Sequence, residues 1–285
     1  MKCRCFPDKN YKSFFFNGKT IRIALDPKKE ISELDYPEFY DVKITNKCDG
    51  KCPYCYMDSK PNKNHVEDLV EKIKSFFGKF DDNQKPFQVA YGGGEPTEHP
   101  DFEECLRASH ELDIVPNYTT NGMFIRYGED KVRSIIEATE KYSQGVAISC
   151  HPHLVEYWTK AAKLFVDKKV KLNFHIIISD KESCDDFRKI YNTWHKDVDY
   201  FVLLPYSDQG RGDAKENELD WDYLCSIMPD NVQQVAFGAN FYPFLCKDRN
   251  KFKVSLYEPE SMSKYLDMTN MKLYNSSFSV EEEEK

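Results

Sequence analysis

Two hydrophobic patterns alternate along most of the chain, beginning after Pro37. Short, nearly continuous apolar runs of the kind that form buried strands are separated by stretches in which apolar residues recur every three or four positions. That second spacing is typical of amphipathic helices. The clearest helical stripe is predicted within His65–Phe77 and consists of Val66, Leu69, Val70, Ile73, Phe76 and Phe77.

The alternation predicts six strand–helix units. The expected strands are Tyr40–Thr45, Phe87–Gly92, Val115–Thr120, Gly145–Cys150, Val170–Ile178 and Tyr200–Tyr206. The clearest helices are His65–Phe77, Asp101–Leu112, Asp130–Tyr142, His153–Asp167 and Cys184–His195. Such alternation favours an α/β fold with a mostly parallel sheet and helices outside it. A closed eight-unit barrel would need two more units, which the pattern does not supply.

The two ends of the chain follow different patterns. Phe14–Phe16 and Thr20–Leu25 flank an Asn-Gly pair, which predicts a β-hairpin. Short strand-like pieces after Asp230 are interpreted as a C-terminal extension rather than a seventh repeat: Gln234–Phe237, Val254–Tyr257 and Leu273–Phe278. The expected division is an N-terminal hairpin extension (1–36), a core (37–216) and a C-terminal extension (217–285) that ends in a disordered acidic tail.

The composition of the chain limits its expected partners and its expected location in the cell. The chain has 285 residues, 40% of them hydrophobic, and a formal net charge of −8, which mildly disfavours a long polynucleotide as partner. No stretch approaches 18 apolar residues and the N-terminus lacks the apolar segment of a secretory signal, so we expect a cytoplasmic protein with no membrane association. In that reducing setting the ten cysteines are expected to be thiols or metal ligands.

Three cysteines, Cys48, Cys52 and Cys55, fall in the loop after the first core strand. One reading is a structural zinc site completed by a distant fourth ligand, such as Cys3, Cys5 or a histidine. The other is a [4Fe–4S] cluster held by three thiolates, with the fourth iron open to another ligand. In parallel α/β folds the loops after the strands form the functional face, which suits either reading.

The spacing C-x3-C-x2-C, with Tyr54 before the last cysteine, resembles the signature of radical S-adenosylmethionine enzymes. Further stretches, each at the end of a predicted strand, are similar to motifs of the same family: Gly93-Gly94-Glu95-Pro96, Thr120-Asn121-Gly122, Ser149 and LLPYSDQGRG (Leu203–Gly212). The resemblance spans about Tyr40 to Gly212. The acidic residue that often follows the fourth-strand serine in this family is absent, because Cys150 and His151 stand there instead.

The resemblance implies a partial (β/α)6 TIM-like barrel and two cofactors. A [4Fe–4S] cluster would be bound by Cys48, Cys52 and Cys55, and S-adenosylmethionine would chelate the open iron through its amino and carboxylate groups. The residues expected to contact S-adenosylmethionine are Tyr54, Gly93, Gly94, Glu95, Thr120, Asn121, Ser149, His175 and Leu204. Within that set, Glu95 is assigned to the methionyl ammonium group and Ser149 to the carboxylate or ribose. Tyr54 is either a platform for the adenine or a core residue beneath the loop.

The reaction implied is formation of a 5′-deoxyadenosyl radical that abstracts hydrogen from a substrate, with electrons from a reductant such as flavodoxin or ferredoxin. A peptide or protein side chain is the favoured substrate. A nucleotide or RNA base is the alternative, since the stretch Phe237–Lys253 mixes aromatic and basic residues. A third possibility is a non-enzymatic zinc-binding interaction module. The expected assembly is a monomer or weak dimer.

A few other residues invite interpretation. Cys3 and Cys5 are expected to be ordinary thiols, and Cys150 is expected to serve packing rather than hydrogen-atom donation. His151 and His153 are considered as substrate contacts. Arg211 is considered as a carboxylate or phosphate ligand, with a plain surface arginine as the commoner case.

Overall fold

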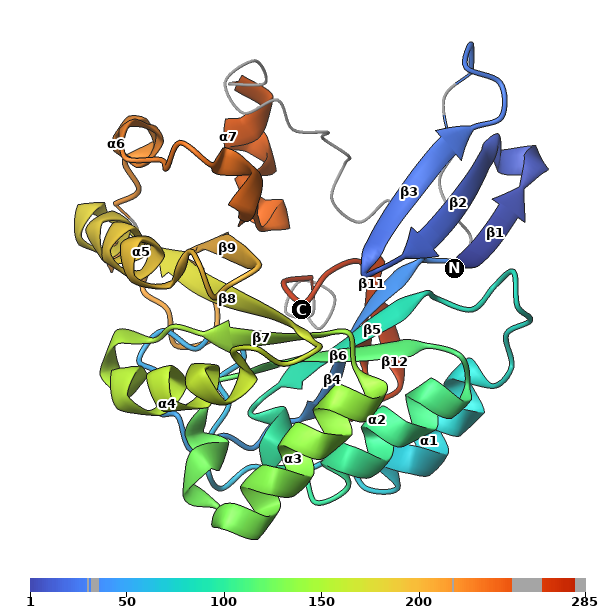
Figure 1. Cartoon of the computed structure of the whole chain (residues 1–285), viewed down its shortest axis with the longest axis horizontal. Helices are drawn as coiled ribbons and strands as arrows, with labels where there is room; N and C mark the ends of the chain where they lie inside the picture. Colours follow the sequence, from blue (N-terminus) through green and yellow to red (C-terminus); the bar gives the residue numbers. More distant parts are fainter. Residues whose placement is uncertain (30, 32–35, 217, 248–262, 280–285) are drawn as a thin grey trace.

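The computed structural model of the chain describes residues 1–29, 31, 36–216, 218–247 and 263–279. Within these residues the strands form two sheets, one of three strands and one of nine (Figure 1). The larger sheet has the order β10-β9-β8-β7-β6-β5-β4-β11-β12 and carries the site described below.

The centre of the large sheet confirms the six predicted strands. They are β4 (Phe39–Thr45), β5 (Gln88–Gly93), β6 (Val115–Thr120), β7 (Gly145–Ser149), β8 (Lys171–Ile178) and β9 (Tyr200–Pro205). Each pairs in parallel with the next strand along the chain. Since all six run the same way, the loops that follow them meet at one edge of the sheet.

Five helices alternate with these strands, as predicted. They are α1 (Leu69–Phe77), α2 (Phe102–Glu111), α3 (Glu129–Tyr142), α4 (Val155–Phe165) and α5 (Lys181–Trp194), and Figure 1 shows α1 to α4 side by side along one face of the sheet. Helix α1 begins later than the predicted His65, because His65 forms an isolated bridge with Thr45 and Asp68 adopts a left-handed conformation just before the helix. Short 3-10 turns lie at Pro7–Lys9, Pro96–Glu98, Met123–Arg126, Pro152–Leu154, Ala214–Glu216, Val232–Gln234 and Ala239–Phe241.

The core lies between the sheet and these helices. In α1 the residues at every fourth position, Leu69, Ile73 and Phe77, are fully buried. Phe174 of β8 packs edge-on against Trp158 of α4 and Phe201 of β9. Burial of each such side chain stabilises the fold by about 1.5–3 kcal/mol, so the helices fix the sheet rigidly enough to position the loops at its edge.

The N-terminal sheet contains the predicted hairpin and one further strand. Strands β2 (Tyr11–Phe16) and β3 (Lys19–Ala24) flank the Asn-Gly turn, and β1 (Lys2–Phe6) pairs with β2. The segment that forms β1 was not predicted; its sequence KCRCF alternates charged residues with cysteines, and its buried residue is the charged Arg4. Buried Arg4 donates to the carbonyls of Tyr36, Pro37 and Asn83, which ties this sheet to the main body.

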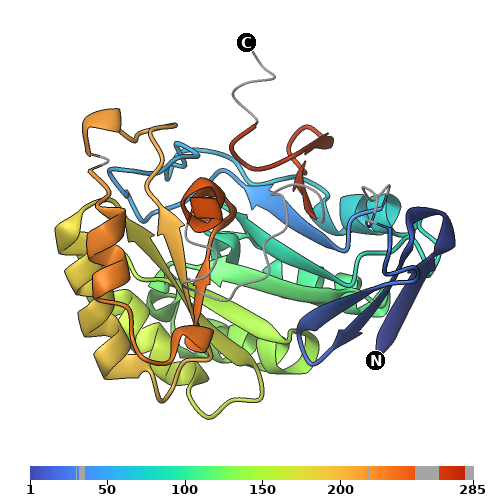
Figure 2. The same cartoon turned by 90° about the horizontal axis from the view of Figure 1, so that it is seen from above.

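The C-terminal segments add strands to both edges of the large sheet. Following α6 (Trp221–Ser226), β10 (Val235–Phe237) pairs in parallel with β9, so it continues the series as a seventh parallel strand, contrary to the interpretation from sequence. After α7 (Tyr242–Lys247), β11 (Ser263–Asp267) pairs in parallel with β4, and β12 (Lys272–Tyr274) pairs antiparallel with β11. Figure 2 shows the red C-terminal strands beside blue β4, at the opposite edge from β10.

Some expectations lie outside the described residues, namely the strand-like piece Val254–Tyr257 and the acidic tail. The division into three regions stays a prediction. Among the described residues no helix is both long enough and apolar enough to cross a membrane.

Candidate active site

A cavity of about 580 Å³ is lined by the loops at the carboxyl ends of the parallel strands and by the inner face of the sheet. It brings together all the residues that were expected to bind the cluster or S-adenosylmethionine. These are Cys48, Cys52, Tyr54, Cys55, Gly93, Gly94, Glu95, Thr120, Asn121, Ser149, His175 and Leu204. Residues that are far apart in the chain therefore share one cavity.

The three cysteines belong to the loop after β4, which we call the cysteine loop (residues 46–60). All three are free thiols that line the cavity. The Cys48 sulfur accepts hydrogen bonds from the backbone N–H of Gly50 at 3.3 Å and from Asn121 Nδ2 at 3.5 Å. Burial raises the pKa of the Cys52 thiol to about 12 and also raises that of Cys48. Metal coordination would have to displace these protons, as it does for cysteine ligands generally.

The donor set fits an iron–sulfur cluster better than a single ion. Within the described ranges no three ligand-type side chains converge on one point as a mononuclear metal requires. A cubane instead takes each thiolate on a different iron, so its ligands surround a volume. Three thiols on the wall of one cavity, with N–H groups directed at one of the sulfurs, match that need. Cys3 and Cys5, considered as extra zinc ligands, lie on β1 and do not line the cavity.

Glu95 connects two of the loops at the cavity edge. Its side chain is buried, and Oε1 accepts from the Thr97 hydroxyl at 2.6 Å, the Thr97 N–H at 3.2 Å and the Thr120 hydroxyl at 2.7 Å. Oε2 accepts from the Asn121 N–H at 2.8 Å, which leaves capacity for a further donor. Burial raises the pKa of Glu95 to about 6, with these hydrogen bonds acting in the opposite direction. All four donors point at its two oxygens, which is the pattern that an ionised carboxylate accepts.

The glycines before Glu95 allow its turn to approach the cysteine loop. Gly93 has a φ of +106°, and a Cβ there would lie 2.4 Å from the Thr45 carbonyl oxygen. Just beyond it, the Gly94 N–H donates to the Thr45 carbonyl and the Glu95 N–H to the Lys47 carbonyl. The turn after β5 is therefore hydrogen-bonded directly to the start of the cysteine loop.

Arg211 does not line the cavity; its side chain is 24% exposed and forms an ion pair with the Asp58 carboxylate. Its Nε and Nη2 donate to the Cys52 carbonyl at 3.0 and 2.8 Å. Its Nη1 donates to Asp58 Oδ1 at 3.0 Å and to the Ser59 carbonyl at 2.9 Å. Neighbouring Gly210 has a φ of +63° and packs against the Tyr56 carbonyl, where a Cβ would clash. The turn after β9 thus holds the cysteine loop from outside.

Tyr54 points into an aromatic group beside the loop. Its hydroxyl lies 3.2 Å from His151 Nδ1, and its ring lies 6.3 Å from that of Tyr206. His153, the second histidine after β7, has its Nε2 3.0 Å from the Gly50 carbonyl oxygen, so it supports the cysteine loop. Burial lowers the pKa of His151 to about 4, which keeps its ring neutral.

Ser149, His175 and Leu204 line the cavity from β7, β8 and β9. Burial lowers the pKa of His175 to about 4. Cys150, one residue past Ser149, is buried and its thiol lies 3.7 Å from the Ile148 carbonyl oxygen. It belongs to the hydrophobic core cluster and lines a second cavity beside Trp158 and Ile176 rather than this one.

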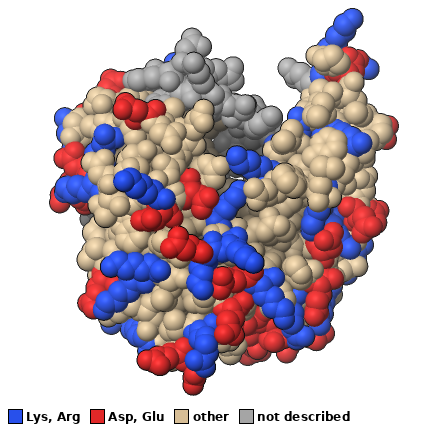
Figure 3. Space-filling view, viewed as in Figure 1, with Lys and Arg blue, Asp and Glu red and all other residues tan. Residues whose placement is uncertain are grey.

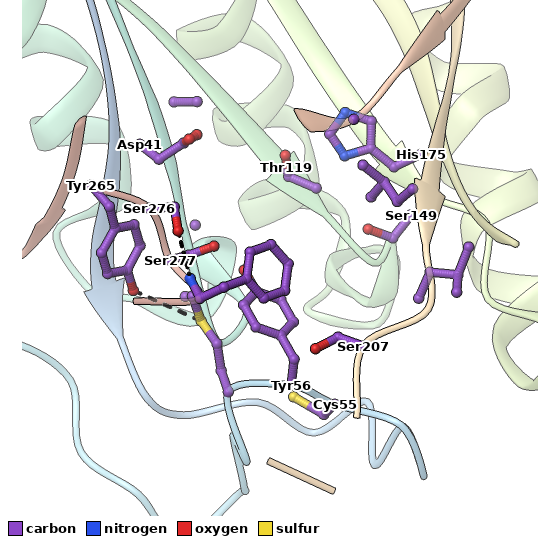
Figure 4. A pocket seen from close by; sticks show the side chains of 18 of the residues that line it. Asp41, Cys55, Tyr56, Thr119, Ser149, His175, Ser207, Tyr265, Ser276 and Ser277 are labelled. Atoms are coloured by element: carbon purple, nitrogen blue, oxygen red, sulfur yellow. Dashed lines mark hydrogen bonds between the residues drawn. The ribbon is translucent and has the colours of Figure 1, made fainter. Parts of the chain in front are cut away.

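Several other residues that line the cavity were not predicted from the sequence. Figure 4 shows Asp41 and Tyr265 on one side of the cavity, His175 and Ser149 on the other, and Tyr56 between them. Ser276, Ser277 and Phe278 reach the cavity from the segment after β12. Asp41 could have been noticed as the one acidic residue inside a predicted core strand. The C-terminal contributors had no such signal, because their approach depends on the pairing of β11 with β4.

The fold and cavity together define a class of protein, an open α/β barrel with three free thiols in the loop after its first strand. Residues 42–193, more than half of the chain, match the model of the radical SAM superfamily. The chain belongs to this superfamily of enzymes, whose members use a [4Fe–4S] cluster and S-adenosylmethionine.

Individual relatives are distant. A PqqA peptide cyclase of Ruegeria pomeroyi is 31% identical over 84 residues, which cover 29% of this chain and 22% of the relative. A 7,8-dihydro-6-hydroxymethylpterin dimethyltransferase of Methanocaldococcus jannaschii is 25% identical over 119 residues, covering 40% and 23%. The crystal structure of SuiB from Streptococcus suis bound to precursor peptide SuiA has a TM-score of 0.68 and 19% identity, covering 87% of this chain and 61% of SuiB. The chain thus spans less than two thirds of each relative, and SuiB supports the fold alone.

Proposed function

We propose that this chain cleaves S-adenosylmethionine reductively and uses the resulting radical on a peptide or protein side chain. One observation carries the first half: the three thiols of the cysteine loop share a cavity with the turns after β5, β6 and β7. These turns hold the residues that the family resemblance assigns to S-adenosylmethionine. The alternative of a non-enzymatic zinc module does not account for that convergence.

The cofactors would carry out the radical chemistry. The chain would bind and orient them and would exclude water from the site. When bound, a [4Fe–4S] cluster supplies the electron that breaks the sulfonium carbon–sulfur bond, which yields a 5′-deoxyadenosyl radical able to take a hydrogen atom. Cys48, Cys52 and Cys55 would hold that cluster. Asn121 and the Gly50 N–H would stabilise the Cys48 thiolate through the hydrogen bonds described above.

The remaining assignments concern S-adenosylmethionine itself. The backbone of Gly93 and Gly94 and the free capacity of Glu95 Oε2 would receive the methionyl ammonium group. Thr120 is engaged by Glu95, so its role would be to hold that carboxylate in position. Ser149, His175 and Leu204 would line the nucleoside end, and neutral His175 could donate or accept one hydrogen bond there. Tyr54 would close the cavity beside the loop.

A peptide substrate is favoured by the relatives, since one is named as a peptide cyclase and SuiB was crystallised with a precursor peptide. The nucleotide alternative depended on exposed aromatics in Phe237–Lys253. In the described part of that stretch, Phe237, Phe241 and Phe244 pack around Trp221, with ring centroids 5.4–5.9 Å away. Residues 248–253 lie outside the described residues. Basic and acidic side chains are also interspersed over the face in Figure 3, without a broad basic region.

The proposal includes a one-electron reductant such as flavodoxin or ferredoxin, a cytoplasmic location and a monomer or weak dimer. It also keeps residues 37–216 as the catalytic core, flanked by the extensions 1–36 and 217–285. The strands β10 and β11 would make the C-terminal extension part of the cavity wall rather than a separate module.

The test is chromatography for 5′-deoxyadenosine after anaerobic reconstitution and reduction with dithionite. The wild type should form it, and Cys48→Ala, Cys52→Ala and Cys55→Ala should each abolish it. Cys246→Ala is the matched control, because Cys246 is an exposed thiol on α7, and it should retain activity. Retained cleavage in any of the three loop variants would remove that cysteine from the proposed ligand set.

A further inference from the structure

Asp41 stands in the middle of β4 with its side chain open to the cavity. Its neighbours Tyr40 and Val42 are buried in the core on the other face, as strand alternation requires. The register places Asp41 beside Ala90 of β5 and Tyr265 of β11. Thr45, at the end of the strand, lies four positions beyond Asp41, or about 13 Å along it. Asp41 therefore lies at the end of the cavity that is remote from the cysteine loop.

No described residue neutralises this carboxylate. The structure contains no hydrogen bond or ion pair to Asp41 from any described residue, as Figure 4 illustrates for its cavity neighbours. Lys43, two residues along the same face, instead forms an ion pair with Asp267 at 2.9 Å. The titratable groups that interact with Asp41 are the phenols of Tyr56 and Tyr265, neither of which carries positive charge.

The Asp41 side chain is exposed to the solvent that fills the open cavity. The protein around it raises its pKa to about 7. A carboxylate in this position gains most from a cation that comes with its own hydrogen-bond donors. The cavity lining combines apolar and hydroxyl side chains, including Ile177, Val202, Thr119 and Ser277, which suit an aliphatic chain. It also includes Lys264, whose ammonium group donates to Asn275 Oδ1 at 2.6 Å.

We propose that Asp41 is the specificity anchor of the substrate cavity and binds an aliphatic cation of the peptide substrate. The cation is the side chain of lysine or arginine or, from a second source, the α-amino group of a peptide terminus. This inference rests on the proposed function and deepens it, because it names the chemistry that would be held at a fixed depth below the radical source. The anchor would set which carbon of the substrate faces that source.

The test compares peptides that differ only in the cation. The probes are acetylated, amidated tripeptides with a central lysine, arginine or norleucine, and the norleucine tripeptide with a free amino terminus. Binding is measured by calorimetry on reconstituted, S-adenosylmethionine-loaded protein, wild type and Asp41→Asn. Asp82→Asn removes the same charge at a fully exposed position and serves as control.

In the wild type and in the Asp82→Asn control, a cationic peptide should bind at least about tenfold more tightly than acetylated norleucine peptide. Preference for lysine or arginine indicates a side-chain cation, and preference for the free amine indicates a terminus. In Asp41→Asn the ratio should fall to about one. Equal affinities in the wild type, an unchanged ratio in Asp41→Asn or no binding of any cationic peptide would each overturn the inference.

The result of this peptide comparison can be distinguished from the result of the test for S-adenosylmethionine cleavage. The peptide comparison in the wild type needs no variant to fold and no turnover. Formation of 5′-deoxyadenosine without a cation preference would overturn the role of Asp41 alone. A cation preference in protein that never cleaves S-adenosylmethionine would leave Asp41 as an anchor and overturn the proposed reaction.

Discussion

At the scale of single residues, Glu95 illustrates how one carboxylate can organise two turns. It collects donors from Thr97, Thr120 and Asn121, so the turns after β5 and β6 keep a fixed relation. The family resemblance marked Glu95 as a ligand of S-adenosylmethionine. The link that it makes between the two turns could not be predicted from sequence, because Thr120 and Asn121 lie 25 and 26 residues further along the chain.

Glu95→Ala should therefore impair both stability and binding. Loss of the carboxylate leaves buried N–H donors unpaired, so the free energy of unfolding should fall by about 2–4 kcal/mol. Affinity for S-adenosylmethionine should fall about tenfold or more. Denaturant titration and calorimetry on reconstituted protein measure the two effects. Glu104→Ala, at an exposed glutamate on α2, should change neither, and an unchanged dissociation constant in Glu95→Ala would remove Glu95 from the site.

Arg211 shows the same dependence on distant contacts. From sequence it was one arginine in a Gly-Arg-Gly turn. In the fold it gives hydrogen bonds to Cys52, Asp58 and Ser59 and closes one side of the cysteine loop. Its planar guanidinium reaches three acceptors at once, which a lysine ammonium cannot reproduce.

Arg211→Lys should keep the charge but loosen the cysteine loop. We expect faster amide hydrogen exchange across residues 52–59 and loss of about 1–3 kcal/mol of local stability, from the broken hydrogen bonds. Mass spectrometry of the exchanged protein measures this. Arg133→Lys, at an exposed arginine on α3, is the control and should leave exchange in the loop unchanged. Exchange in Arg211→Lys equal to that in the wild type would show that other contacts hold the loop.

At the scale of elements, hydrophobic periodicity was enough to predict the strands at the centre of the sheet but not those at its edges. Strands β4 to β9 are apolar runs separated by amphipathic helices, and both patterns are local. Strand β11 (sequence SKYLD) is short and partly charged, and its place beside β4 depends on a contact between residues more than 200 positions apart. No local signal specifies such a pairing. The part of the cavity wall that Tyr265 and the residues after β12 form could therefore not be predicted either.

The pair formed by β11 and β12 supplies a controlled test of that edge. Leu266 and Leu273 are register partners, yet Leu266 is fully buried and Leu273 is 47% exposed. Leu266→Ala should lower the free energy of unfolding by about 2–5 kcal/mol, since it leaves a cavity in the core. Leu273→Ala should cost less than about 0.5 kcal/mol. Equal, small effects in denaturant titrations would mean that β11 does not close the sheet in solution.

At the scale of the whole molecule, three cysteines line one cavity and the others lie elsewhere in the fold. Cys48, Cys52 and Cys55 share the cavity wall. The others lie on different elements, with Cys3 and Cys5 on β1, Cys225 buried on α6 and Cys246 exposed on α7. A second cubane would need three or four thiolates around one volume. The described residues provide a single such set.

Iron and sulfide analysis with Mössbauer spectroscopy tests this account most directly. After clean reconstitution we expect about four irons per chain in the wild type. The triple variant Cys48→Ala, Cys52→Ala, Cys55→Ala should bind none. About eight irons in the wild type with about four surviving in the triple variant would contradict the account and indicate a second cluster. Stoichiometric zinc in place of iron would contradict it as well.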